Sequence, residues 1–231
     1  MTDIVARALS LLIGYVCGHF ITGYFLAKRE HIDLKHEGSG NVGSTNTMRT
    51  MGVRKGLLAF AGDMGKVFVA GIVSWLLFRG YFEGSAHILL FYAGMGAILG
   101  HVYPVYMKGG GGKGVACTAA MVIMSCPIAA PGSLVVFIAV VLATRYVSLG
   151  SIIAELSYLL QLFCFSRLGL IPLEGTHLYE AYVISVLAVA LSIYKHNSNI
   201  NRLIHHEEKK FSINKKTKGS ENTDESKDKE A

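Results

Sequence analysis

The stretch GLLAFAGDMGKVFVAGIVSWLLF, residues 56–78, decides the class of fold. Asp63 and Lys66 are its only charged residues, and its length is enough for a helix to cross the roughly 30 Å hydrocarbon core of a bilayer. The two charges stand three residues apart, so they can neutralise each other on one face of the helix. We therefore interpret residues 56–78 as a transmembrane helix that carries an internal ion pair.

Similar apolar stretches recur along the whole chain. They cover residues 4–27, 86–107, 115–130, two segments within 133–165 that separate near Arg145, and 178–194. The chain is 52% hydrophobic and only 16% charged, against about 25% charged in an ordinary soluble domain. We expect an all-α, polytopic integral membrane bundle of about seven transmembrane helices, in one domain over residues 1–208. The fourth and fifth stretches are short, and a re-entrant hairpin around Pro131-Gly132 is the alternative.

The distribution of Lys and Arg predicts the orientation, because these residues are retained on the cytoplasmic side. If the loop of residues 28–55 is inside, only Arg7, Arg79 and Arg167 of the 22 Lys and Arg residues lie outside, with Lys66 within a span. The N-terminus is then outside and the C-terminus inside. Residues 209–231 are charged and almost free of apolar side chains, which predicts a disordered cytoplasmic tail.

The first predicted cytoplasmic loop contains GSGNVGSTN, residues 38–46, followed by Arg49. Glycines at alternate positions allow successive backbone N–H groups to point at one anion, and the hydroxyls and amides between them add donors. A flexible linker is the alternative. The expected phosphate-binding residues are Ser39, Gly40, Asn41, Gly43, Thr45, Asn46 and Arg49.

A second loop on the same face reads GHVYPVYMK over residues 100–108, and continues through Gly109-Gly110 into GGKG at 111–114. A Lys set among glycines presents an ammonium and backbone donors to phosphate oxygens together. It is not a nucleotide P-loop, because Lys113 precedes Gly rather than Ser or Thr and no strand flanks it. The candidates are Lys108, Gly111, Gly112, Lys113 and Gly114 for phosphate, and His101 for catalysis.

Two further polar segments fall on the same predicted face. Residues 145–151 join two spans and add Arg145, a candidate phosphate ligand or a membrane-interface anchor. They also add Ser148, a candidate catalytic residue. HNSNINRL, residues 196–203, follows the last span. There His196, Asn199 and Arg202 roughly share a helical face, and we expect a catalytic role for all three.

These segments resemble the acyl-phosphate:glycerol-3-phosphate acyltransferases of bacteria, the PlsY family. The resemblance rests on GSGNVGSTN with Arg49, on GHVYPVYMK with GGKG, and on HNSNINRL. It implies an inner-membrane enzyme that makes lysophosphatidic acid from glycerol-3-phosphate and a long-chain acyl phosphate. It also implies a soluble partner enzyme that supplies the acyl phosphate, and no metal or other cofactor. Membrane lipid is expected to surround the protein, and nucleic acid is not an expected partner.

The resemblance further implies that acyl-CoA is not the donor. Consistently, none of the nine His residues is followed by Asp five positions later, the motif of acyl-CoA-dependent enzymes. The chain departs from the family pattern at Gly109-Gly110, where Phe-Lys is usual, and at His206-Glu207-Glu208, where Gly-Thr-Glu is usual.

Two questions stay open from the sequence. His196 or a phosphate oxygen of the donor could accept the proton of the attacking hydroxyl. An anion or organophosphate transporter is the alternative function, but it predicts an internal repeat and binding elements near the bilayer midplane, and the sequence shows neither.

Overall fold

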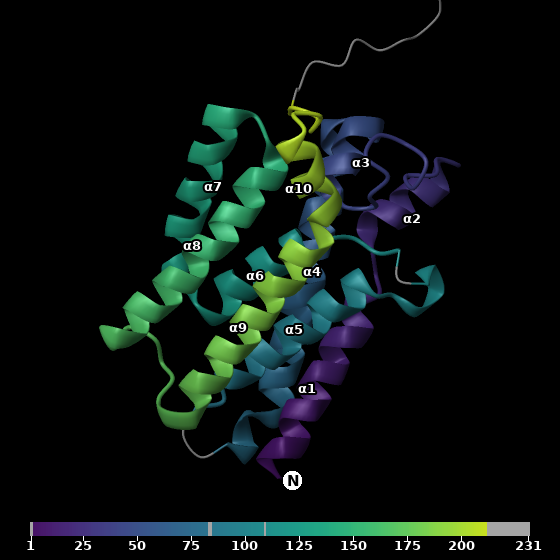
Figure 1. The fold of residues 1–231 in the computed structure, drawn as a ribbon. Helices are drawn as coiled ribbons and strands as arrows, with labels where there is room; N and C mark the ends of the chain where they lie inside the picture. The colour runs from purple at the N-terminus through teal and green to yellow at the C-terminus, as the bar shows by residue number, and fades with distance from the viewer. Residues whose placement is uncertain (1, 83–84, 109, 212–231) are drawn as a thin grey trace, which may run out of the picture.

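The computed structural model describes residues 2–82, 85–108 and 110–211, and every regular element in these ranges is helical (Figure 1). The elements are α1 (Asp3–Gly18), α2 (Thr22–Arg29), α3 (Ser44–Met51), α4 (Val53–Phe78), η1 (Arg79–Tyr81), α5 (Ile88–Val102), η2 (Val105–Met107), α6 (Val115–Ser125), η3 (Pro127–Ala129), α7 (Ala130–Thr144), α8 (Val147–Arg167), α9 (Gly175–Lys195) and α10 (Asn197–Ile204).

Six helical segments in these ranges are long and apolar enough to cross a membrane: residues 3–29, 53–81, 88–107, 127–144, 147–167 and 175–195. The seventh expected span is the short apolar helix α6. At 1.5 Å per residue its eleven residues reach only about 16 Å, roughly half of the hydrocarbon core. The multi-pass helical fold is confirmed, and the seventh segment is a short helix that turns back through η3 into α7.

Two expected boundaries lie elsewhere in the structure. The turn between α6 and α7 falls at Cys126–Ala129, and Pro131-Gly132 belongs to the first turn of α7. Proline is tolerated there, because the first N–H groups of a helix have no partner within it. The break between α7 and α8 is also shorter than expected and involves only Arg145, in the left-handed region with φ 64°, and Tyr146.

Small residues bring α1 and α5 into close contact. A Cβ added to Gly14 would lie 2.1 Å from the carbonyl oxygen of Ala93, and one added to Gly96 would lie 2.0 Å from that of Leu11. Such close backbone approach is how helices associate in lipid, where the hydrophobic effect drives little association. The helix α5 forms the centre of the bundle, with α1, α4, α6 and α9 packed around it.

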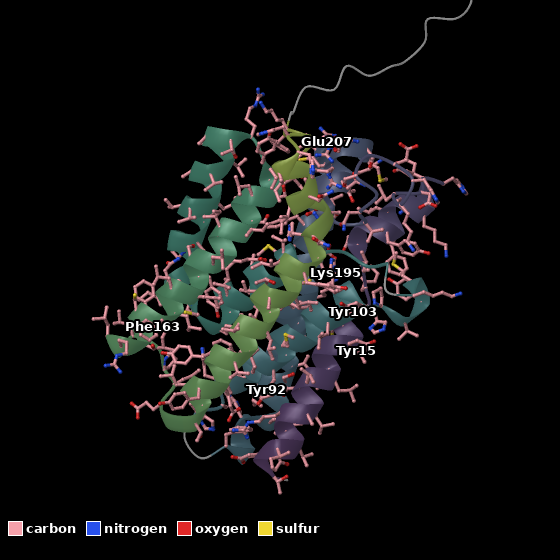
Figure 2. All side chains as sticks on the ribbon, in the orientation of Figure 1. Tyr15, Tyr92, Tyr103, Phe163, Lys195 and Glu207 are labelled. Carbon is pink, nitrogen blue, oxygen red and sulfur yellow. The ribbon has the colours of Figure 1, made fainter. Side chains whose placement is uncertain are left out.

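The helix α7 stands apart from this centre. It has no buried residue and packs chiefly on α8 (Figure 1). At the end of the bundle opposite the N-terminus, α2, α3, α10 and the tip of the α7–α8 hairpin come together (Figure 1). Side-chain nitrogen atoms gather at this end, near the labelled Glu207 (Figure 2). It is the end that the charge distribution assigns to the cytoplasm.

Candidate active site

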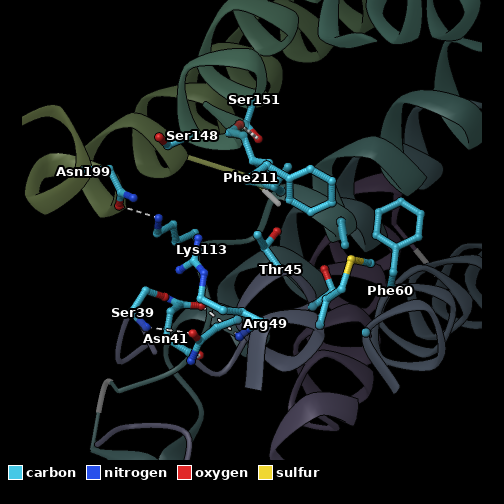
Figure 3. A pocket seen from close by; sticks show the side chains of 18 of the residues that line it. Ser39, Asn41, Thr45, Arg49, Phe60, Lys113, Ser148, Ser151, Asn199 and Phe211 are labelled. Atoms are coloured by element: carbon cyan, nitrogen blue, oxygen red, sulfur yellow. Dashed lines mark hydrogen bonds between the residues drawn. The ribbon is translucent and has the colours of Figure 1, made fainter. Parts of the chain in front are cut away.

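A cavity of about 320 Å³ lies at this end of the bundle (Figure 3). All four polar segments singled out in the sequence contribute to its lining. From the predicted set it is lined by Ser39, Asn41, Gly43, Thr45, Asn46, Arg49, His101, Lys113, Gly114, Ser148, His196 and Asn199. The structure therefore brings together side chains that are up to 160 positions apart in the chain.

Asn46 holds the first loop in shape. Its amide oxygen accepts a hydrogen bond from the backbone N–H of Ser39 at 2.7 Å, and its amide nitrogen donates to the carbonyl oxygens of Asn41 (2.8 Å) and Glu37 (2.9 Å). The Asn46 side chain is 2% exposed, and its amide is fully used within the loop. We assign it to shaping the loop, and leave direct phosphate contact to its neighbours.

The start of α3 supplies backbone donors to the cavity. The helix begins at Ser44, and Gly43, Ser44 and Thr45 all line the cavity. The first N–H groups of a helix have no intrahelical acceptor and carry the positive end of the helix dipole, which favours an anion. Asn41 fixes the entry to this turn, since its amide oxygen accepts the N–H of Gly43 at 2.8 Å.

Two cations reach the cavity from different elements. Arg49 comes from α3, is half-buried, and has no hydrogen bond or ion pair among the described residues. Lys113 comes from the glycine loop and donates to the amide oxygen of Asn199. Figure 3 shows both side chains directed toward the same space. The pKa of Lys113 is lowered to about 8, chiefly by burial; the charge of Glu208 opposes this fall, and the charges of Arg202 and Arg49 contribute to it.

The glycines before Lys113 are required by close packing. A Cβ at Gly112 would lie 2.0 Å from Nε2 of His101, and one at Gly111 would lie 2.1 Å from the His101 carbonyl oxygen. The N–H of Gly112 donates to that carbonyl at 3.1 Å. Gly111 and Gly112 are buried behind the cavity rather than lining it. They hold the loop against His101, and Lys113 projects into the cavity.

His101 belongs to a buried polar network. The ammonium of Lys66 donates to Nδ1 of His101 at 2.8 Å and to Asp63 at 3.0 Å, which confirms the expected Asp63–Lys66 pair. Because Nδ1 accepts, the neutral ring carries its proton on Nε2, the atom that faces Gly112. His101 is therefore a support for the glycine loop, and its geometry does not suit a general base.

His196 has the opposite arrangement. Its Nδ1 lies 2.8 Å from the carbonyl oxygen of Ser192, which can only accept, so Nδ1 carries the proton and Nε2 has the free lone pair. The side chain is 2% exposed and lines the cavity. Burial, together with the charge of Lys113, lowers the pKa of His196 to about 4. The ring is thus neutral near pH 7 and able to accept a hydrogen bond.

Glu208 is a site residue that the sequence reading did not identify. One of its oxygens accepts from Asn199 at 2.7 Å and from Ser148 at 2.8 Å, and the other accepts from Nε of Arg202 at 2.7 Å. Burial would raise the pKa of Glu208, but these hydrogen bonds outweigh it and hold the pKa below its usual range. A single carboxylate thus orients three of the predicted catalytic side chains.

The departure at His206-Glu207-Glu208 keeps a Glu at its last position. Glu208 lies six residues after Arg202 and occupies the place of the Glu in the family's Gly-Thr-Glu. His206, which stands in place of the Gly, has φ 59°, the left-handed region that Gly adopts readily and His uncommonly. The spacing from Arg202 was the signal that could have identified Glu208 in the sequence.

A second, smaller pocket of about 140 Å³ adjoins the cavity. It is lined by Ser39, Gly40, Asn41, Lys113, Lys195, Ser198, Asn199 and Arg202. Four of these residues, Ser39, Asn41, Lys113 and Asn199, line both spaces. Gly40 and Arg202 thus join the site through the second pocket, and Lys195 and Ser198 are additional lining residues.

Besides Gly111 and Gly112, two more predicted phosphate ligands lie outside both spaces. Lys108 is exposed and lines neither of them. Arg145 is also exposed, and only its backbone carbonyl reaches the site region, where it accepts the N–H of Phe211 at 2.7 Å. Of the two readings of Arg145 from the sequence, the interface anchor fits its position better.

One side of the cavity is apolar. Leu57 and Phe60 come from α4, and Phe137 and Val141 come from α7. Leu57 is 54% and Phe60 39% exposed, so this side of the cavity reaches the surface that faces lipid. In the part of the chain that the structure describes, no group of His, Cys, Asp and Glu side chains is arranged to hold a metal ion.

Fold and site together define a multi-pass membrane protein with a cationic cavity at one end that continues into an apolar space between helices. The chain belongs to the glycerol-3-phosphate acyltransferase family, because the model of that family matches residues 8–206. The glycerol-3-phosphate acyltransferase of Trichlorobacter lovleyi is 38% identical over 197 residues, covering 85% of this chain and 93% of the relative. That of Aquifex aeolicus is 38% identical over 206 residues, covering 89% and 100%.

The fold is also similar to two crystal structures of PlsY, an integral membrane glycerol 3-phosphate acyltransferase. The glycerol 3-phosphate form has a TM-score of 0.76 at 33% identity and covers 89% of this chain and 96% of that chain. The lysophosphatidic acid form has a TM-score of 0.74 at 33% identity, with 90% and 96% covered. The resemblance read from the motifs is thus confirmed, and the enzyme is favoured over the transporter.

Proposed function

We propose that this chain transfers a fatty acyl group from an acyl phosphate to glycerol-3-phosphate and releases lysophosphatidic acid and inorganic phosphate. The observation that carries the proposal is the pair of adjoining spaces, which share Ser39, Asn41, Lys113 and Asn199. A two-substrate reaction between a lipid and a small polar acceptor needs this arrangement, with the reacting atoms held where the two spaces meet.

The chemistry of each space suits a different substrate. The smaller pocket is lined almost entirely by polar and charged side chains, including Arg202, and fits the polar acceptor glycerol-3-phosphate. The larger cavity runs from Arg49 and the start of α3 to the apolar side chains of α4 and α7. It fits a lipid with an anionic head and a long chain that lies toward the bilayer.

In the proposed reaction, the hydroxyl oxygen of glycerol-3-phosphate attacks the acyl carbonyl carbon. A new ester C–O bond forms, the C–O bond to the donor phosphate breaks, and phosphate leaves with the bonding electron pair. An acyl phosphate is a mixed anhydride and needs no further activation, so the protein contributes mainly position and charge stabilisation. Lys113 and Arg49 stabilise the anionic groups.

The attacking hydroxyl must also lose its proton. The pKa of His196, about 4, makes its imidazole a weak base, and a phosphate oxygen of the donor is the better final acceptor. We infer that Nε2 of His196 accepts the hydrogen bond of the hydroxyl and orients its oxygen, while phosphate takes the proton.

Replacing His196 by Ala is expected to lower kcat roughly tenfold, short of the 10²–10⁴-fold that losing a true general base costs. A fall in kcat within that larger range would instead identify His196 as the general base.

The donor is tested directly with detergent-purified protein and labelled glycerol-3-phosphate. Palmitoyl phosphate is supplied in one reaction and palmitoyl-CoA in another, and label in lysophosphatidic acid is measured. Product from palmitoyl phosphate alone supports the proposal. Product from palmitoyl-CoA alone would contradict the donor.

We also propose that the enzyme lies in the bacterial inner membrane with this site on the cytoplasmic side. The bias of Lys and Arg toward the loops at that end supports the orientation. A long-chain acyl phosphate would then arrive from a cytoplasmic enzyme, through a transient contact at the same face.

A further inference from the structure

Residues 208–211 form a strap across the cavity, a name used below for this segment. It leaves α10 and touches three other elements. Glu208 bonds to Ser148 on α8, the ammonium of Lys209 donates to the Gly38 carbonyl oxygen at 2.8 Å, and the N–H of Phe211 donates to the Arg145 carbonyl oxygen at 2.7 Å. The strap thus joins the first loop to the α7–α8 turn, which lie on different sides of the cavity.

Phe211 is the apolar member of the strap. Its side chain is half-buried and lines the cavity together with Val141 and Val147. In Figure 3 it lies on the same side as Ser148 and Ser151. Phe211 therefore stands where the polar end of the cavity meets its apolar side, which is where the acyl carbonyl of the proposed donor would be placed.

Water competes with glycerol-3-phosphate at this carbonyl. If a water oxygen attacks instead, the same C–O bond to phosphate breaks, the water proton passes to the departing phosphate, and the products are free fatty acid and inorganic phosphate. Excluding water from a closed site is how enzymes protect reactive groups from hydrolysis. A site that opens to the cytoplasm and handles a mixed anhydride needs such protection.

We propose that the strap keeps bulk water from the acyl carbonyl and that Phe211 is a specificity residue favouring glycerol-3-phosphate over water as acceptor. The inference rests on the proposed acyl phosphate donor. Phe211 lies beyond residues 8–206, the stretch that the family model matches. The strap is held by its ends, and the ring of Phe211 covers the site without taking part in the chemistry.

The test measures two products from one reaction. Full-length protein in lipid nanodiscs is given palmitoyl phosphate and labelled glycerol-3-phosphate, and lysophosphatidic acid and free palmitate are quantified together. Phe211→Ala is expected to raise the ratio of hydrolysis to transfer on the order of tenfold, equivalent to about 1.4 kcal/mol of lost discrimination. Phe211→Leu, which keeps an apolar cover, is expected to retain most of the wild-type ratio.

Ile204→Ala is the matched control, because Ile204 is a large apolar residue on the neighbouring helix that is 69% exposed and lines neither space. This variant should leave the ratio of hydrolysis to transfer unchanged.

An unaltered ratio in Phe211→Ala, or an equal rise in Ile204→Ala, would overturn the strap proposal alone. A wild-type protein that makes no lysophosphatidic acid from palmitoyl phosphate would overturn the donor and the strap together. Should Phe211→Ala prove unfolded, Lys209→Ala frees the strap at the Gly38 contact and must raise the same ratio.

Discussion

At the scale of single residues, burial determines the charge of two side chains in the polar cavity. Lys113 and His196 both lose basicity in the same site, with opposite consequences for their charge near pH 7. Lys113 stays largely protonated and can bind phosphate, whereas His196 is neutral and can accept a hydrogen bond. Burial thus leaves one cation and one neutral acceptor in the same site.

This difference predicts the pH dependence of the reaction. The pKa of Lys113 is lowered to about 8, so the ammonium is present below that pH and is lost as the pH rises through it. We expect kcat/KM, which reports the free enzyme, to fall above about pH 8. Bound phosphate favours the ammonium, so the fall in kcat should come at higher pH.

Lys113→Arg is the control for this assignment, since a guanidinium does not titrate in this range. The alkaline fall should disappear in that variant, whatever its absolute rate. An alkaline fall at the same pH in Lys113→Arg would assign it to another group.

At the scale of elements, the glycine loop is a rigid part of the site. Replacing Gly112 by Ala would place a Cβ 2.0 Å from Nε2 of buried His101, so the loop that carries Lys113 must shift. Since a shift of about 1 Å in a catalytic group can cost 10²-fold, we expect a loss of that order in kcat/KM. Gly65→Ala, which meets nothing within 4 Å, should keep normal activity, and equal activity in the two variants would contradict this role.

The Asp63–Lys66 pair joins the elements beneath the site. Besides Asp63 and His101, the ammonium of Lys66 bonds the carbonyl oxygens of Gly18 (3.1 Å) and Phe20 (2.8 Å), at the break between α1 and α2. Lys66→Met leaves the Asp63 charge buried without a partner, and should lower the free energy of unfolding by roughly 3–5 kcal/mol. The double variant Asp63→Asn, Lys66→Met should lose less than the two single losses combined.

Thermal unfolding of the full chain in detergent measures this coupling. Val69→Ala, a replacement on the lipid-exposed face of the same helix, is the control and should shift the midpoint little. Strict additivity of the two single variants would show that the pair does not act as a unit.

The sequence predicted the elements better than their ends or the contacts between them. Apolar length alone located every long span, and glycine-rich motifs located the polar loops, because both signals are local. The break after Gly18 could not be predicted, since its free carbonyls are satisfied by Lys66 from another helix. The sequence made both Lys108 and Lys113 candidate phosphate ligands. Only the packing of Gly111 and Gly112 on His101 directs Lys113 inward. Glu208 was overlooked because its contact with Ser148 on α8 joins residues 60 positions apart.

At the scale of the whole molecule, the candidate active site lies at one end of the bundle. The N-terminus lies at the opposite end, where Arg7 pairs with Glu180 at 2.8 Å. The site end joins the first loop, the glycine loop, the α7–α8 turn and α10 around one cavity. Residues 209–211 of the predicted tail contact this end, and the prediction of disorder for 212–231 lies outside the described residues. The described residues therefore form a membrane-spanning bundle with this cationic cavity at one end.

The central claim is that acyl transfer takes place in this cavity, with Lys113 as an essential cation. The most direct test compares Lys113→Ala with Lys108→Ala in lysophosphatidic acid formation from labelled glycerol-3-phosphate and palmitoyl phosphate. The two lysines are five positions apart at opposite ends of the same loop, and only Lys113 lines the cavity. We predict a loss of about 10²-fold or more in kcat/KM for Lys113→Ala, and near-normal activity for Lys108→Ala. Equal activities, or a greater loss for Lys108→Ala, would contradict the location of the site.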